Sequence, residues 1–420
     1  MSASTSRHSR LGSAVSATVG LLLAGMVTTP VYAESVRERE WHLTAMKAEQ
    51  IWQTSTGKGI TVAVIDTGVN DNLTDLKGRV LAGKDEAPDS PGDEHTDYDG
   101  HGTTMALLIA GTGQGNGGEG TFGLAPGARI LPVRMPDRGW DAGRYSREFS
   151  RTLSGGIRYA ADSGAQVINI SMGSSKGSDQ LSAAVKYALD KGALVFAAVG
   201  NSGAGGNQIE YPAATPGVVG VGAVGRDLHK TVESEFGAQV DLAAPGAEMY
   251  HACPNGKDLC RSHGTSDATA IASASAALIW SRHPTWTNNQ VLRVLLNTIG
   301  APTDGAKRND SIGYGIVRPR IALQSPGDPG PAGQYPLPDL AAAPASAAPS
   351  ASASDSGAAG ALVKEGGLPA SPSPSGSPSG SPSGDGGSGV LRAGLAVGFL
   401  VVLGAGAVVL AVRRRRRGHA

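Results

Sequence analysis

The chain carries no net charge and almost no cysteine. Lys and Arg together number 36, as do Asp and Glu, so the formal charge is zero. A balanced charge gives no reason to expect an acidic polymer as partner, and we predict no nucleic-acid binding. Only two cysteines are present, and the acidic run 85–99 shows no recognisable calcium-ligand spacing. We therefore expect no metal site and no cofactor.

Residues 325–389 have few large apolar side chains. Pro, Ala, Ser and Gly dominate this segment, which includes SPSPSGSPSGSPSG at 371–384. A segment with so little apolar surface cannot offset the entropy lost on ordering. We therefore predict a disordered linker over 325–389.

Apolar stretches lie near both ends of the chain. Residues 1–33 have a basic start, an apolar run and the small-residue site VYA, which is typical of a cleaved signal peptide. An uncleaved anchor is the alternative, and the shortness of the run disfavours it.

The second apolar stretch lies near the carboxyl end. Residues 393–412 contain no charge, are long enough to cross the roughly 30 Å core of a bilayer, and precede five arginines. Arginines beside a span mark the cytoplasmic side. We predict a single-pass protein of the cell membrane, with a transmembrane helix at 390–412, a cytoplasmic tail at 413–420 and the folded part outside the cytoplasm.

Residues 59–324 are predicted to form one folded domain. Apolar, β-branched runs such as 59–69 and 165–173 alternate with helical patterns such as 100–111 and 179–192. This alternation indicates right-handed crossovers and an α/β fold, in which a mostly parallel sheet carries helices on both faces. In such sheets, functional groups collect at the carboxyl ends of the strands.

Four polar residues occupy such positions. Asp66 follows the apolar strand TVAVI, His101 begins a helix within DGHGT, and Ser266 lies within GTS before a helix of small residues. Asn201 ends a further apolar strand within AAVGN. Taken singly, each would more often be a turn or cap residue. Their joint occurrence favours a catalytic site.

These residue types fit nucleophilic catalysis by serine. A serine hydroxyl becomes a good nucleophile when a neighbouring base takes its proton, and an imidazole titrates near neutral pH. A carboxylate can hold the imidazole tautomer, while an amide can bind the developing oxyanion. We therefore predict that Asp66, His101 and Ser266 form the catalytic triad, with Asn201 and the Ser266 backbone N–H as oxyanion donors.

The segments VIDTGV, DGHGT, AAVGN and GTS, in that order, resemble the signature of the subtilisin-like serine proteases, or subtilases. The resemblance implies a subtilisin-like fold and a serine endopeptidase acting on polypeptide substrates. It also implies that a strand end pairs with extended substrate opposite a second segment. The substrate-binding residues on these two segments would be Ser171, Met172 and Gly173, and Ala198 and Gly200.

The arrangement of segments along the whole chain resembles the mycosins, the membrane-anchored subtilases of actinobacterial type VII secretion systems. This resemblance implies membrane components of such a system as partners. Residues 34–58 are too few for the inhibitory pro-domain of many subtilases. They include several large apolar side chains, so we expect them to pack permanently on the catalytic domain.

The chain departs from the subtilase pattern at two positions that follow Ser266. Subtilases usually have an apolar or aromatic residue directly after the catalytic serine and a proline four residues after it. Here Asp267 and Ala270 stand at these positions. Alanine is a good helix former and removes no catalytic atom. Asp267 adds a charge beside the oxyanion site, which leaves open a second hypothesis: a structural scaffold of a membrane secretion complex with little or no turnover. An esterase is disfavoured because Ser266 lacks a Gly-x-Ser-x-Gly elbow.

Cys253 and Cys260 enclose the short turn-forming segment CPNGKDLC. In an exported chain such a pair favours a disulfide. Two alternatives stay open, namely a metal site, which would need further ligands, and a catalytic thiol, for which His251 and His263 are near in sequence.

Overall fold

The computed structural model describes residues 35–136, 141–255 and 258–342. The predicted signal peptide, transmembrane helix, cytoplasmic tail and most of the predicted linker lie outside these ranges. Within the described ranges, no helix is both long enough and apolar enough to cross a membrane.

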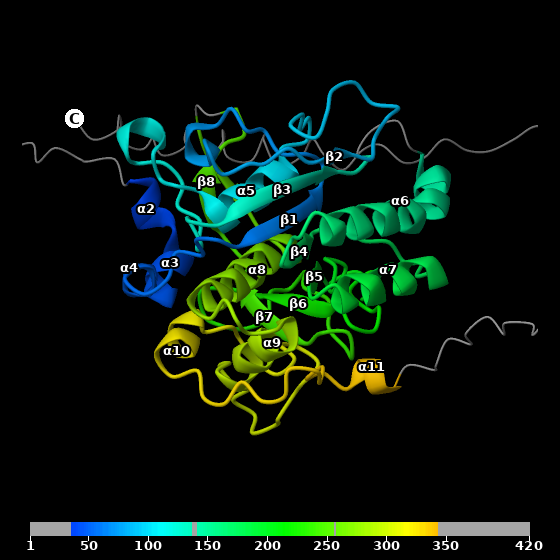
Figure 1. Cartoon of the computed structure of the whole chain (residues 1–420). Coiled ribbons are helices and arrows are strands. Elements are labelled where there is room, and N and C mark those ends of the chain that lie inside the picture. The colour runs from blue at the N-terminus through cyan, green and yellow to red at the C-terminus, as the bar shows by residue number, and fades with distance from the viewer. Residues whose placement is uncertain (1–34, 137–140, 256–257, 343–420) are drawn as a thin grey trace, which may run out of the picture. The chain divides into compact units, whose positions relative to one another are not determined.

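A sheet of seven parallel strands forms the framework of the described chain (Figure 1). The strand order is β2-β3-β1-β4-β5-β6-β7, and each neighbouring pair runs parallel. The α/β fold with a mostly parallel sheet is therefore confirmed. The strands are β1 (Thr61–Asp66), β2 (Lys84–Asp85), β3 (Arg129–Arg134), β4 (Val167–Ile170), β5 (Leu194–Ala198), β6 (Val219–Val224) and β7 (Leu242–Pro245).

Helices cover both faces of this sheet because its strands are apolar on both sides. Val62 and Val64 of β1 join a core with α5, α8 and α9, whereas Ala63 and Ile65 join a second core with α6 and α7. Alternate strand residues point to opposite faces, so both predicted helical layers are needed to bury them. These helices are α5 (His101–Ala110), α6 (Ala142–Asp162), α7 (Asp179–Asp190), α8 (Thr265–Arg282) and α9 (Asn288–Asn297).

The amino-terminal segment packs on this domain through α2 (Val36–Arg39), α3 (Trp41–Met46) and α4 (Ala48–Trp52). Leu43 and Ile51 are buried within the same core as α5 and α8. The Trp41 indole N–H donates to the Ala247 carbonyl oxygen at 2.8 Å, and the Trp52 indole N–H donates to Leu124 O at 2.9 Å. The segment thus adds apolar side chains to the core and anchors them with hydrogen bonds.

The expected start of the linker at residue 325 is too early. After α10 (Pro319–Gln324), the chain stays on the domain as far as α11 (Asp339–Ala342). Leu337 is buried, the Tyr335 hydroxyl donates to the Gly217 carbonyl oxygen at 2.9 Å, and Arg293 Nη1 donates to Pro329 O at 2.6 Å. The Pro- and Gly-rich composition predicted disorder here because the few anchoring side chains contribute little to it.

We predict that a chain beginning at Gly59 unfolds at a lower temperature than one beginning at Glu34. It would lose Trp41, Leu43 and Ile51 from the core, each worth about 1.5–3 kcal/mol. The midpoint should therefore fall by about 10 °C or more in a thermal melt.

The matched control is a chain lacking only residues 34–39, because α2 has no buried residue, and its melting temperature should change little. Equal stability and full activity of the chain beginning at Gly59 would instead make residues 34–58 a dispensable leader.

Candidate active site

The predicted site residues meet at the carboxyl edge of three adjacent strands. Asp66 ends β1, Ser171 directly follows β4, and Asn201 lies just beyond β5. The chain extends from β1 to β3 on one side and, later, to β4 on the other. Such a reversal of strand order leaves a crevice at the carboxyl ends, where ligands bind in open α/β sheets.

Asp66 and His101 are in direct contact. His101 Nδ1 lies 2.6 Å from Asp66 Oδ1, which also accepts a hydrogen bond from the Thr67 N–H at 2.8 Å. Asp66 is fully buried, whereas the His101 side chain is 32% exposed. The carboxylate therefore holds Nδ1 as the protonated nitrogen and leaves Nε2 free to act as a base.

The environment of His101 raises its pKa. Burial lowers the pKa, but the Asp66 charge and hydrogen bond, together with the charges of Asp267 and Asp99, raise it to about 9. A base must first lose its own proton. The arrangement therefore favours activity on the alkaline side of neutrality.

Ser266 lies near the start of α8 and is 9% exposed. Its Oγ donates to the Ser171 carbonyl oxygen at 3.3 Å, and within the described residues no hydrogen bond joins it to His101. Proton transfer to His101 thus requires the hydroxyl to turn away from Ser171. Such a rearrangement is usual, because catalytic hydrogen bonds tighten only when substrate is bound.

Asn201 is fixed beside the nucleophile. Its Oδ1 accepts hydrogen bonds from the Thr265 N–H at 3.0 Å and from the Thr265 hydroxyl at 3.2 Å. Gly264, the N-cap of α8, has φ 124°, and a Cβ there would lie 3.0 Å from Asn201 Oδ1. The chain can therefore turn this tightly only with glycine. With Oδ1 occupied, the Asn201 Nδ2 group remains as a donor for an oxyanion.

The substrate-binding residues implied by the resemblance flank the same point. The Ser171 hydroxyl donates to Ser266 O at 3.2 Å, and the Gly200 N–H donates to the Thr265 hydroxyl at 3.3 Å. Gly173 O accepts a hydrogen bond from Tyr145 at 3.3 Å. Met172 packs on the core beneath α6 and α7, and Ala198 is the last residue of β5. These two segments therefore border the nucleophile on the sheet side.

Comparison with known proteins finds similarity to subtilases. Residues 57–315 match the model of the subtilase family. The chain is 36% identical over 263 residues to Subtilisin NAT of Bacillus subtilis subsp. natto, which covers 62% of this chain and 65% of that protein. It is 39% identical over 237 residues, or 56% of this chain, to the cell wall-associated protease of Bacillus subtilis (strain 168), of which it spans only 25%.

Two solved structures are also similar. MycP1 from Mycobacterium smegmatis superposes with a TM-score of 0.61 at 28% identity, covering 72% of this chain and 88% of that one. The MycP3 protease from the type VII (ESX-3) secretion system gives a TM-score of 0.57 at 33% identity, covering 67% and 87%.

The chain belongs to the subtilase family.

A residue that the sequence did not reveal supports the histidine of this subtilase. Asp97 Oδ1 accepts hydrogen bonds from the Thr67 hydroxyl at 2.8 Å and from the Gly100 N–H at 2.7 Å. Its Oδ2 accepts from the Thr103 N–H at 2.8 Å. Asp97 therefore ties the first turn of α5 to the chain that follows Asp66. The part of the acidic run that the structure describes shows no group of His, Cys, Asp or Glu side chains able to hold a metal ion.

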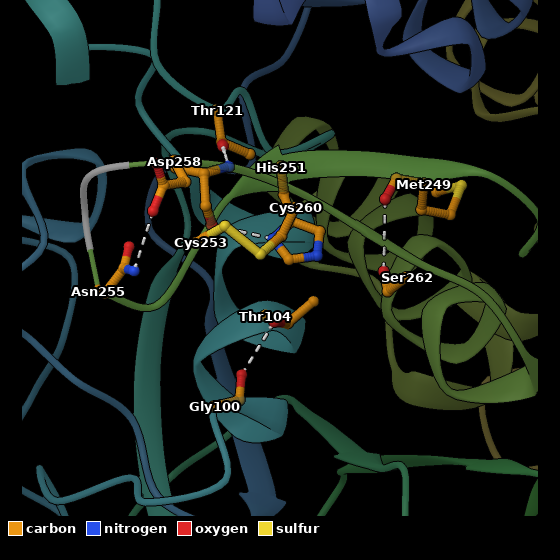
Figure 2. Close-up of a disulfide and its surroundings, with 11 residues drawn as sticks. Gly100, Thr104, Thr121, Met249, His251, Cys253, Asn255, Asp258, Cys260 and Ser262 are labelled. Carbon is orange, nitrogen blue, oxygen red and sulfur yellow. Dashed lines mark hydrogen bonds between the residues drawn. A yellow bond between two sulfur atoms is a disulfide. The ribbon is translucent and has the colours of Figure 1, made fainter. Parts of the chain in front are cut away.

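The disulfide pair lies on the hairpin of β8 (Met249–Ala252) and β9 (Leu259–Ser262), where the structure joins Cys253 to Cys260 (Figure 2). Figure 2 also labels Gly100, which precedes His101. Pro254 presses on this glycine, since a Cβ at Gly100 would lie 2.6 Å from Pro254 Cγ. The bridged loop therefore borders the base as well as leading to the nucleophile.

Asp267, the departure from the subtilase pattern, is fully buried in the first turn of α8. Its Oδ1 accepts a hydrogen bond from the Ser262 hydroxyl at 2.9 Å, and its buried Oδ2 has no partner among the described residues. Burial raises the pKa of Asp267 to about 7. The group can therefore take up a proton near neutrality. Ala270 is also buried in α8, where it fits a helix interior without strain.

We predict that Asp267→Asn moves the acid limb of the kcat/KM profile to lower pH. Where His101 titrates, Asp267 is ionised because its pKa is the lower of the two, so the substitution removes a negative charge that raises the His101 pKa. A shift of roughly half a unit or more is expected.

The control is Asp99→Asn, which removes an exposed carboxylate that also faces His101 and should shift the limb less because solvent screens it. An unmoved or raised acid limb in Asp267→Asn would contradict this account.

Proposed function

We propose that the chain is a membrane-anchored serine endopeptidase whose catalytic domain lies outside the cytoplasm and whose Ser266 forms an acyl-enzyme. The observation that carries the proposal is the buried Asp66 carboxylate 2.6 Å from His101, at the strand edge where Ser266 and Asn201 also lie. Subtilisin NAT and the mycosin structures support the same chemistry by similarity.

The residues divide the reaction into two steps. His101 Nε2 takes the Ser266 proton while Oγ bonds to the substrate carbonyl carbon, and Asp66 stabilises the resulting imidazolium. Asn201 Nδ2 and the Ser266 N–H hold the oxyanion. The C–N bond then breaks, and the amine leaves with the proton from His101. Water next attacks the ester with His101 again as base, which releases the acid and restores Ser266.

The buried Asp267 bears on the alternative of a scaffold with little turnover. Its Oδ1 accepts a hydrogen bond from the Ser262 hydroxyl, and its pKa of about 7 lies below that of His101, so the group is ionised when His101 acts as a base. That charge raises the His101 pKa and so stabilises the imidazolium that forms during the reaction. The charge that favoured a scaffold is therefore compatible with turnover.

The proposal places the enzyme at a type VII secretion system. The apolar stretch 393–412 followed by five arginines supports an anchor with a cytoplasmic carboxyl end. Similarity to MycP3, a protease from a type VII secretion system, supports the association. Membrane components of such a system are then the partners, and a polypeptide is the substrate.

We predict that a fluorophosphonate probe labels the full-length protein and that Ser266→Ala abolishes the label. Replacing Asp66, His101 or Ser266 singly by Ala should each remove nearly all peptidase activity, and the triple variant should lose little more, because the three residues act as one unit. The control is Ser273→Ala, because Ser273 lies on the same helix but its hydroxyl donates a hydrogen bond to Asn169. The probe should still label this variant. Turnover near wild-type level in Ser266→Ala would exclude the acyl-enzyme.

A second prediction concerns the anchor. Protease added to intact cells should release the catalytic domain by cutting within residues 343–389, and a small carboxyl-terminal fragment should stay protected. Antibodies against the two ends would follow the fragments, with permeabilised cells as the control in which the small fragment is also digested. Protection of the whole chain in intact cells would show that the orientation is wrong.

A further inference from the structure

Two carboxylates stand beside the segments that border the nucleophile. Glu210 lies at Gly173, after β4, and Glu235 lies at Gly200, after β5. A Cβ on either glycine would collide with the neighbouring carboxylate oxygen. The carboxylates thus occupy the space that these two glycines leave open.

The same two segments must receive a substrate side chain if the proposed function holds. Ser171 is hydrogen bonded to Ser266, and Gly200 directly precedes the oxyanion donor Asn201. A peptide carbonyl placed on Ser266 and Asn201 therefore brings the side chain of its own residue against residues 171–173 and 198–200. Glu210 and Glu235 adjoin Gly173 and Gly200 of these segments, so that side chain would come near both carboxylates.

Glu235 is built into the site. It is fully buried, its Oε1 accepts hydrogen bonds from the Ser202 hydroxyl at 2.6 Å and the Ser202 N–H at 3.3 Å, and its N–H donates to Gly200 O at 3.1 Å. Its Oε2 is buried with no hydrogen-bond partner among the described residues. A buried carboxylate oxygen without a donor is costly. Glu235 therefore holds an uncompensated carboxylate oxygen next to Gly200.

Glu210 is only partly buried, and no hydrogen bond or ion pair joins its carboxylate to another described residue. Burial, followed by the charge of Glu235, raises the pKa of Glu210 to about 7. The Glu235 charge thus disfavours ionisation of Glu210, and within the described residues no Lys, Arg or His forms an ion pair with either carboxylate. Such a pair favours the binding of a cation.

We propose that Glu210 and Glu235 make this protease select a lysine or arginine as the residue before the cleaved bond. A cationic side chain would supply donors to the partly exposed Glu210 carboxylate, and charge-assisted hydrogen bonds of this kind are the strong ones. The buried Glu235 would add the attraction of its charge. Norleucine, with the same length but no charge, would leave both carboxylates unpaired.

The test uses full-length protein and p-nitroanilide peptides that are identical except for a last residue of lysine, arginine, norleucine or leucine. We expect kcat/KM to be at least about tenfold higher for lysine and arginine than for norleucine, which a difference of about 1.4 kcal/mol would produce. Glu210→Gln should lower the lysine-to-norleucine ratio about tenfold. Glu233→Gln removes the same charge from a side chain that pairs with His263 instead, and should leave the ratio unchanged.

Labelling of Ser266 by a fluorophosphonate separates the possible failures. A labelled wild-type protein that prefers norleucine or leucine, or a labelled Glu210→Gln whose ratio does not move, would overturn this inference and leave the proposed function standing. A protein that neither labels nor hydrolyses any peptide would overturn the proposed function and this inference with it. An equal fall in Glu233→Gln would reduce the effect to net charge and also overturn the inference.

Discussion

The contact between the buried Asp66 carboxylate and His101 is the constraint on which the rest of the site depends. A charge with no solvent exposure at a strand end persists only if a partner is held against it. Because His101 begins α5, that requirement fixes the start of the helix. Asp97 ties the first turn of α5 back to Thr67, and Pro254 of the bridged hairpin presses on Gly100. The hairpin and the acidic loop therefore both help to hold the His101 imidazole in place beside Asp66.

The small residues of α8 determine where the nucleophile Ser266 lies. This helix contacts β1, β4, β5, β6 and β7, and it is buried from Thr265 to Trp280. Alanine and serine let it approach the strands closely enough for Ser266 to reach the carbonyl of Ser171. Helix and sheet edge are thus positioned by one packing arrangement, which the amino-terminal segment extends by adding Leu43 and Ile51 to the same core.

Those features that could be predicted from sequence share one physical cause. Asp66 and Asn201 stand out because a polar residue ends an apolar run, and His101 and Ser266 because each begins a helix rich in small or apolar residues. The missed features depend on contacts between distant segments. Asp97 binding Thr67, or Glu210 filling the space at Gly173, follows from the path of loops, to which no spacing rule applies. Likewise, Leu337 holds the start of a Pro-rich segment on the domain although its surroundings read as linker.

The charge of the whole chain hides a local imbalance that links the base to the substrate. Lys and Arg balance Asp and Glu overall, yet Asp66 and Asp267 act on His101, while Glu210 and Glu235 lie at Gly173 and Gly200. The first two keep His101 protonated to higher pH, and the last two raise the cost of leaving the substrate region without a cation. A positively charged substrate side chain would reduce that cost when it binds, whereas an uncharged one would not. The carboxylates that the folded protein leaves without a cation would therefore make the enzyme prefer cationic substrates.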